Sequence, residues 1–197
     1  LSEQEANIVI IGKSVHPHPD MPDTIYSAAE LAENNGATAL PIQVDIRFDD
    51  QIQKAINQAV DTFGRIDAVV NAAAVIQRGD STKTSMPSYD LINQINVRGA
   101  FMLCKFASDY LKDSNNSQII NVCPPVSCFD SKTTQDALVY TLSKLELSYI
   151  TLALSSEYQE SGIGVNGIWP KFPIHGDESM YLGDFATSQP YSPDVLA

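Results

Sequence analysis

Cysteine is scarce in this sequence. Cys104, Cys123 and Cys128 are the three cysteines among 197 residues, and no two of them form a Cys-x-x-Cys pair. An odd and sparse set of thiols is typical neither of a disulfide framework nor of a structural zinc site. It fits a reducing compartment, and we expect a cytoplasmic protein.

Positive charge and long hydrophobic runs are also in short supply. Lys and Arg number 12 against 24 Asp and Glu, which gives a formal net charge of −12. This balance argues against nucleic acid or an anionic membrane surface as a partner. The longest apolar runs, such as Ile8–Ile11, are too short to span a bilayer, and the first residues do not resemble a signal peptide.

Hydrophobic residues make up 44% of the chain, enough for one compact domain over residues 1–197. Short apolar strands alternate with amphipathic helical patterns. This alternation predicts βαβ units and an α/β fold with a mostly parallel sheet. The expected strands are residues 7–11, 39–45, 66–71, 118–123 and 165–169, and the expected helices are 24–33, 49–63, 88–111 and 136–161.

The segment between the first strand and the first helix is rich in proline. His16, His18 and Asp20 lie there and could in principle hold a metal ion. Three prolines in seven residues exclude regular structure, and solvated loop residues are the favoured interpretation. We therefore expect no metal site.

Asn96 lies in the middle of the long helix expected at residues 88–111. Asparagine is an indifferent helix former whose amide can bond a neighbouring carbonyl and loosen the helical hydrogen bonds. The alternative, an exposed asparagine, is equally compatible with the sequence.

Tyr140 and Lys144 are four residues apart near the start of the last expected helix. This spacing places both side chains on one helix face, about one turn apart. A phenol normally loses its proton near pH ~10, and a neighbouring ammonium group favours the phenolate. The pair is therefore a candidate for proton transfer near neutral pH.

Ligands of an open α/β sheet bind outside the carboxyl ends of its strands. We expect this edge to bring together the helix start that carries Tyr140 and Lys144 with the residues that follow each strand. Those residues are Gly12-Lys13, Asp45-Ile46, Asn71-Ala72-Ala73, Cys123-Pro124 and Pro170-Lys171.

Four motifs occur in a specific order. They are Asn71-Ala72-Ala73-Ala74 after a strand, Asn96 in a long helix, Tyr140-x-x-x-Lys144, and Asn166-x-x-Trp169-Pro170. In this combination the sequence resembles the short-chain dehydrogenase/reductase family. The resemblance implies a Rossmann-type, doubly wound parallel sheet in three α/β/α layers.

The resemblance also implies NADP(H) as the cofactor and assigns roles to residues. Tyr140 would be the proton donor or acceptor, Lys144 would hold the nicotinamide ribose, and Asn96 would position a water in a proton relay. The residues expected to bind the cofactor also include Lys13 near the 2′-phosphate, Asp45 against the adenine, Asn71 at the sheet edge beneath the cofactor and Ile174 at the carboxamide. Ile46, Ala72, Ala73 and Pro170 complete this set. A cation such as Lys13, at the strand end where an acidic residue binds NAD, suits NADP(H).

The sequence departs from the family pattern in its first segment. The family has a Gly-rich turn between its first strand and first helix, and this chain has none; its residues 1–6 resemble the tail of that helix. We therefore expect an incomplete domain that lacks the first strand with its Gly-rich loop and the last strand, within a longer parent protein.

A second departure concerns the catalytic serine, whose position holds Pro124. Loss of one such donor costs roughly 10²–10³ in rate in other enzymes. Ser127, Ser131 or Cys123 could substitute, although plain loop or buried residues are the favoured interpretation of each. A third departure, Ala72 and Ala74 in place of Asn and Gly, narrows the approach of the cofactor without blocking it.

The leading hypothesis is an NADP(H)-dependent oxidoreductase acting on a carbonyl or alcohol of a hydrophobic small-molecule substrate. The alternative is a catalytically impaired or non-catalytic Rossmann-fold protein, because of Pro124. A third and weaker idea is a thiol enzyme with Cys123 and His175. The resemblance also implies a homo-oligomer paired through the helices at residues 88–111 and 136–161.

Overall fold

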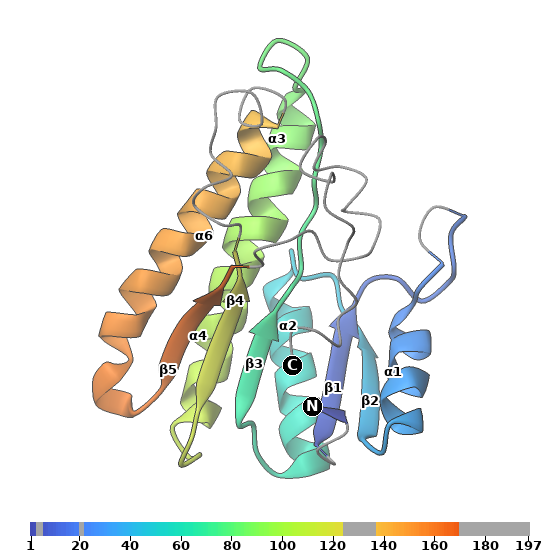
Figure 1. Cartoon of the computed structure of the whole chain (residues 1–197), viewed down its shortest axis with the longest axis vertical. Coiled ribbons are helices and arrows are strands. Elements are labelled where there is room, and N and C mark those ends of the chain that lie inside the picture. Colours follow the sequence, from blue (N-terminus) through green and yellow to red (C-terminus); the bar gives the residue numbers. More distant parts are fainter. Residues whose placement is uncertain (3–5, 20–21, 124–136, 170–197) are drawn as a thin grey trace.

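The computed structural model describes residues 1–2, 6–19, 22–123 and 137–169 (Figure 1). Strands and helices alternate along this part of the chain, as the sequence predicts. In chain order the elements are β1 Asn7–Gly12, α1 Ile25–Asn34, β2 Thr38–Gln43, α2 Asp49–Phe63, β3 Ala68–Asn71, α3 Met86–Asn93, the π-helix η2 Gln94–Gly99, α4 Ala100–Leu111, β4 Gln118–Val122, α6 Leu138–Glu157, the 3-10 helix η4 Gln159–Ser161 and β5 Gly164–Ile168.

Every strand pairing is parallel, which confirms the expected α/β architecture. β1 pairs with β2 in one sheet, and β4 lies between β3 and β5 in another. Figure 1 shows β1 and β3 as neighbours, with the carboxyl ends of all five strands at one edge. Helical crossovers join the strands, as parallel pairing requires.

Among the described residues, no ladder of hydrogen bonds joins β1 to β3. Among the described residues these two strands belong to separate sheets, so each has an edge with no strand paired to it. Val70 of β3 is 48% exposed, although a parallel strand is normally buried on both faces. Within the described ranges, the facing edges of β1 and β3 therefore stay without strand hydrogen bonds.

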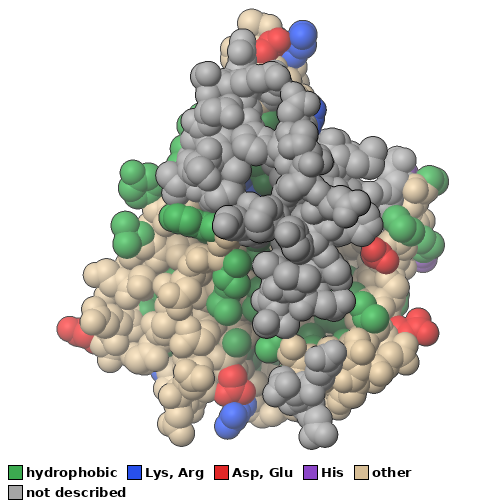
Figure 2. Space-filling view, viewed as in Figure 1, with side chains coloured by type: hydrophobic (Ala, Val, Ile, Leu, Met, Phe, Trp, Pro, Cys, Tyr) green, Lys and Arg blue, Asp and Glu red, His purple; other side chains and the backbone are tan. Residues whose placement is uncertain are grey.

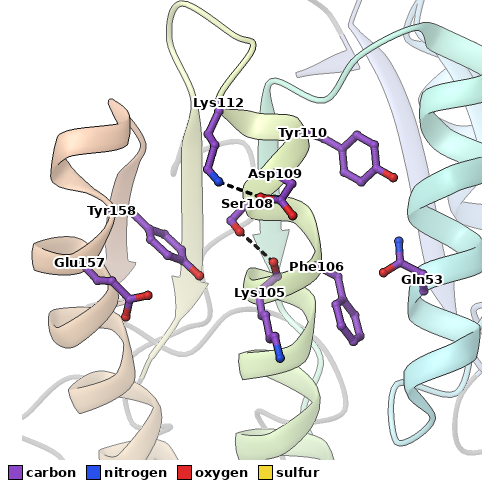
Figure 3. Close-up of a pocket in the computed structure, with 9 residues that line it drawn as sticks. All are labelled: Gln53, Lys105, Phe106, Ser108, Asp109, Tyr110, Lys112, Glu157 and Tyr158. Atoms are coloured by element: carbon purple, nitrogen blue, oxygen red, sulfur yellow. Dashed lines mark hydrogen bonds and ion pairs between the residues drawn. The ribbon is translucent and has the colours of Figure 1, made fainter.

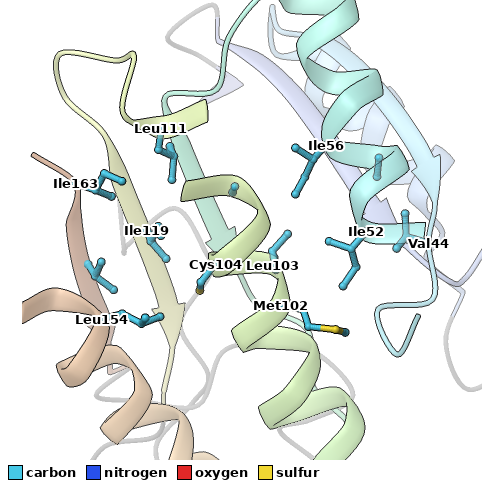
Figure 4. Packing of buried hydrophobic residues seen from close by; sticks show 13 residues of the cluster. Val44, Ile52, Ile56, Met102, Leu103, Cys104, Leu111, Ile119, Leu154 and Ile163 are labelled. Atoms are coloured by element: carbon cyan, nitrogen blue, oxygen red, sulfur yellow. The ribbon is translucent and has the colours of Figure 1, made fainter. Parts of the chain in front are cut away.

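One hydrophobic core nevertheless joins the two sheets (Figure 4). Val44 after β2 and Ile52 of α2 belong to the same cluster as Leu103 of α4 and Ile119 of β4. Apolar contacts of this kind are non-directional and proportional to buried area. Packing through α2 and α4 therefore connects the half with β1 and β2 to the half with β3, β4 and β5.

Local chemistry explains where the helices begin and end. Thr24 caps α1 in a capping box with Ser27, and Gly64 ends α2 in the left-handed conformation with φ 84°. The helix expected at residues 88–111 begins earlier, because Ser85 provides the N-cap for α3 and Pro87 fits its first turn. No helix in the described ranges is long and apolar enough to cross a membrane.

The helix expected at residues 88–111 is helical without a break from Met86 to Leu111, but its middle turn is a π-helix and not an α-helix. The π-helix η2 separates α3 from α4 and contains Asn96. The last helix is also shorter than expected, since α6 covers Leu138–Glu157 and continues as the 3-10 turn η4.

Candidate active site

Tyr140 and Lys144 lie on the first turns of α6, on one face as predicted. The Lys144 ammonium is 6.0 Å from the centroid of the Tyr140 ring. It donates a hydrogen bond of 3.1 Å to the carbonyl of Val122, the last residue of β4. Lys144 is only 4% exposed. A buried cation therefore lies beside the phenol at the carboxyl end of a central strand.

Asn96 is fully buried and fastens η2 to the loop after β3. Its Oδ1 accepts from the backbone N–H of Val75 at 2.8 Å, and its Nδ2 donates to the Val75 carbonyl at 3.0 Å. The asparagine amide thus bonds a carbonyl, one of the two alternatives left by the sequence, and the exposed alternative was wrong. A π-bulge in a helix frequently accompanies a functional site.

Ser143 joins Asn96 to the helix that carries Tyr140. Asn96 Nδ2 donates to Ser143 Oγ at 3.0 Å, and Ser143 Oγ donates to the Tyr140 carbonyl at 2.7 Å. Ser143 is not among the site residues predicted from the sequence. Its place directly before Lys144, three residues after Tyr140, was the available signal.

A second buried polar network lies behind the strand ends. Asn71 Nδ2 donates to Asn121 Oδ1 at 3.2 Å, and Asn121 Nδ2 donates to Thr151 Oγ1 at 2.9 Å. The network ties β3 to β4 and β4 to α6. Asn71 Oδ1 is buried and has no hydrogen-bond partner among the described residues.

Lys13 and Asp45 meet at the carboxyl ends of β1 and β2. Lys13 Nζ is 3.8 Å from Asp45 Oδ2, and the Lys13 side chain is largely exposed. Arg47 Nε donates to Asp45 Oδ1 at 2.8 Å. The hydrogen bonds from the Arg47 side chain hold the pKa of Asp45 below its usual value, against a smaller opposing effect of burial. Asp45 is therefore a carboxylate between two cations.

Arg98 and Gly99 connect η2 to the same loop. Arg98 Nη1 donates to the Arg47 carbonyl at 2.9 Å, and Arg98 Nη2 donates to Asp49 Oδ1 at 2.7 Å. A Cβ on Gly99 would lie 2.8 Å from Ile46 Cδ1 and 3.1 Å from the Ile46 carbonyl oxygen. Only glycine allows the backbone of η2 to approach the Asp45-Ile46 segment this closely.

The described candidate residues form two groups at the carboxyl edge of the strands. Tyr140, Lys144 and Asn96 lie around α6 and η2, whereas Lys13, Asp45 and Ile46 lie at the ends of β1 and β2. Ala72 and Ala73 are exposed directly after β3. The candidates Pro170, Ile174, Pro124, Ser127, Ser131 and His175 lie outside the described residues.

These residues fit a dinucleotide whose two ends lie apart along one sheet edge. The alanines after β3 are exposed, Lys13 provides an exposed cation at one end, and the Lys144 ammonium lies at the other. Gly162, Gly164 and Gly167 have the Gly-x-Gly-x-x-Gly spacing, but they lead into strand β5 and not from a strand into a helix. They therefore cannot form a phosphate-binding turn.

In the described part of the chain, no group of three or more His, Cys, Asp or Glu residues could hold a metal ion. A surface hollow of about 510 Å³ lies between α2, α4 and the end of α6 (Figure 3). The Lys112–Asp109 ion pair of 2.7 Å lies in it, and burial raises the pKa of Tyr158 there. Tyr158 ends α6 near the amino end of β5, so this hollow is at the opposite edge from Tyr140.

The chain is similar in sequence to known proteins. The family described as short chain dehydrogenase matches residues 3–173. Hydroxysteroid dehydrogenase-like protein 2 of Xenopus laevis is 39% identical over 193 residues, covering 98% of this chain and 46% of that protein. The Homo sapiens protein of the same name is 36% identical over 193 residues, with the same coverage of 98% and 46%. The chain spans about half the length of these curated relatives.

Solved structures of dehydrogenases have the same fold. A short chain dehydrogenase from Mycobacterium thermoresistibile has a TM-score of 0.87 at 32% identity, covering 98% of this chain and 69% of that one. A putative dehydrogenase from Xanthomonas campestris has a TM-score of 0.82 at 34% identity, covering 88% and 65%. A putative dehydrogenase from Burkholderia cenocepacia with bound NADP has a TM-score of 0.74 at 22% identity, covering 86% and 61%, and shows likeness of fold alone.

Proposed function

Because this chain belongs to the short-chain dehydrogenase family, we propose that it is an NADP(H)-dependent oxidoreductase acting on a carbonyl or alcohol of a hydrophobic small molecule. The observation that carries the proposal is the buried Lys144 ammonium 6.0 Å from the Tyr140 ring. The names of the relatives, which refer to hydroxysteroids, support an apolar substrate.

The proposed chemistry is a hydride transfer coupled to a proton transfer. When bound, NADPH supplies the hydride to the carbonyl carbon. Tyr140 gives its phenolic proton to the carbonyl oxygen, and in the reverse direction the phenolate takes that proton back. The Lys144 ammonium stabilises the phenolate and holds the nicotinamide ribose.

Asn96 supports Tyr140 and Lys144 through its hydrogen bond to Ser143. Both hydrogens of its amide are used, one by the Val75 carbonyl and one by Ser143 Oγ. A relay water held by this side chain would therefore bind Oδ1, which keeps one lone pair beside its bond from the Val75 N–H.

The preference for NADP(H) rests on the adenine end of the site. Lys13 is exposed at the end of β1 and is the proposed ligand of the 2′-phosphate. Asp45 is proposed to face the adenine, and Asn71 is proposed to support the sheet edge beneath the cofactor. Ile46, Ala72 and Ala73 are further proposed contacts of the cofactor. Pro170 and Ile174, which lie outside the described residues, are proposed to contact the nicotinamide end.

A second candidate function is a Rossmann-fold protein with impaired or no catalysis. The observation that favours it is Pro124 at the position of the family's serine, because proline has no hydroxyl to polarise a carbonyl. In that case Tyr140 and Lys144 would bind the cofactor without turnover.

Titration of the full-length protein with NADPH, followed by turnover with a panel of ketones and aldehydes, tests both candidates. We expect NADPH to bind more tightly than NADH, and Tyr140→Phe to lower kcat by about 10²–10⁴ while NADPH binding is kept. Tyr26→Phe is the control, because Tyr26 lies on α1 and is 55% exposed. It should leave kcat unchanged.

The outcomes separate the two candidates. Failure of the intact protein to bind either dinucleotide would exclude the first candidate. NADPH binding without turnover, the same in wild type and Tyr140→Phe, would establish the second.

We also propose a homo-oligomer in a reducing compartment, the cytoplasm. Leu142, Tyr149 and Leu152 of α6 are half or more exposed, and Phe101 of α4 is 42% exposed. Hydrophobic side chains gather on the left edge of the molecule in Figure 2, where Figure 1 places α6. Cys104 and Cys123 are free thiols, which supports the proposed compartment.

A further inference from the structure

We propose that Ser143 is a positioning residue, whose hydroxyl couples the π-helix η2 to the turn of α6 that presents Tyr140 and Lys144. The inference rests on the proposed function of that pair. Ser143 does not touch the reacting atoms in this proposal. It acts through Tyr140 and Lys144.

The hydrogen bonds around Ser143 leave little freedom for its hydroxyl. The oxygen accepts from Asn96 Nδ2 at 3.0 Å, and its single hydrogen goes to the Tyr140 carbonyl at 2.7 Å. Ser143 and Asn96 are both fully buried, so water does not substitute for either partner. The hydroxyl thus accepts a hydrogen bond from η2 and donates one within α6.

At its other end, this series of hydrogen bonds is attached to the loop after β3. Asn96 holds both backbone polar groups of Val75, in the segment that follows the Asn71-Ala72-Ala73 motif. Hydrogen bonds therefore connect the loop after β3, through Asn96 and Ser143, to the backbone of Tyr140.

The beginning of α6 needs such support. Its N-cap residue, Ala137, forms no side-chain capping hydrogen bond. Without a side-chain cap, the first N–H groups of a helix need other hydrogen-bond partners. Ser143 lies one residue before Lys144, so a shift of its backbone moves the ammonium relative to the phenol ring.

Ser148 offers a matched comparison on the same helix. Its hydroxyl donates to the Lys144 carbonyl at 3.1 Å, four residues back, within α6. Ser143→Ala and Ser148→Ala thus remove the same group from one helix, but only Ser143 takes part in the bond from Asn96.

The test compares Ser143→Ala, Ser143→Cys and Ser148→Ala in the full-length protein, by kcat, KM for NADPH and the pH dependence of kcat. Ser143→Cys keeps the side-chain volume and weakens the hydrogen bonds, so it serves if the alanine variant does not fold. We expect both Ser143 variants to lose about 10- to 100-fold in kcat, because small misplacements of reacting groups are costly. KM for NADPH should stay within about twofold, as expected when only transition-state interactions are lost.

A measurement that does not depend on turnover tests this inference separately from the proposed function. The titration of the Tyr140 phenol is followed by NMR of tyrosine labelled with ¹³C at Cζ, with Tyr140→Phe to assign the signal. In Ser143→Cys the midpoint should move to higher pH by about half a unit or more, since the ammonium is less well placed. Ser148→Ala should leave it unchanged.

Each outcome of these measurements bears on the role of Ser143 or on the proposed function. If wild type neither binds NADPH nor turns over, the proposed function fails, and the phenol titration alone tests the coupling. Equal midpoints and equal kcat in wild type, Ser143→Cys and Ser143→Ala would overturn the role of Ser143. A fall in melting temperature without a change in midpoint or pH profile would mean a structural role only and would also overturn it.

Discussion

Lys144 brings an ammonium group into a position that is 4% exposed. Burial of a charge is costly unless hydrogen bonds or opposite charges compensate for the lost water. The Val122 carbonyl provides one such bond, and the Tyr140 ring lies 6.0 Å away. The four-residue spacing predicted the neighbourhood of the two side chains, but burial of the lysine depends on β4 beneath α6.

Cys104 allows a residue-scale prediction of pH dependence. Burial raises the pKa of this thiol from 9.0 to about 11. Between these two values the unfolded chain loses the proton and the folded protein keeps it, so the free energy of unfolding falls as pH rises. Denaturant unfolding under reducing conditions from pH 8 to 10.5 should show a decrease of roughly 2 kcal/mol from this group.

Cys104→Ala is the control for this prediction, because alanine has no titrating group. The variant should be less stable at pH 8, as it leaves a small cavity, but its stability should fall less steeply with pH. Parallel curves for wild type and variant would contradict the assignment to Cys104.

At the scale of elements, the interruption of a long helix is the feature that organises the site. η2 places Asn96 toward Val75 and Ser143, and it places Arg98 and Gly99 against the loop that contains Asp45-Ile46. One π-turn therefore contacts both the proposed catalytic residues and the proposed adenine-binding residues.

Gly99→Ala tests the close approach of η2 to Ile46. Alanine is the better helix former by about 1 kcal/mol, and the φ of −61° at Gly99 suits it. We expect destabilisation by about 1–3 kcal/mol nevertheless, because the new Cβ would lie 2.8 Å from Ile46 Cδ1. Denaturant unfolding measures the change.

The same substitution in an Ile46→Ala background is the control. Ile46→Ala removes the side-chain clash and leaves the contact to the Ile46 carbonyl. Gly99→Ala should therefore lower the free energy of unfolding less in this background than in wild type. An equal cost in both backgrounds would show that the approach of η2 to the Ile46 side chain does not set the requirement for glycine.

At the scale of the whole molecule, the proposed oligomer predicts a surface on α6 that is covered in solution. Leu152→Glu should dissociate the oligomer by placing a charge at an apolar contact, as measured by sedimentation velocity. Leu31→Glu is the matched control, since Leu31 on α1 is 64% exposed and Leu152 is 68% exposed. Equal sedimentation of wild type and Leu152→Glu as oligomers would place the contact elsewhere, and a monomeric wild type would contradict the oligomer itself.

The order of strands and helices and the position of the Tyr140–Lys144 pair were predicted correctly because both follow from local periodicity. The π-helix was not predicted. Its Asn96 bonds Val75, 21 residues away, and Ser143, 47 residues away, and local periodicity does not indicate such distant contacts. The helix starts at Met86 and Leu138 were missed by about two residues.

The sequence by itself determined the α/β class, the acidic surface and the pairing of a tyrosine with a lysine on one helix face, because residue type and the helical period decide these locally. Only the tertiary structure decided which polar side chains share a network. Hydrogen bonds such as Asn96–Ser143 and Asn71–Asn121 join elements that are distant in the chain. They form only after packing has excluded water, when a buried polar group must find a partner within the protein.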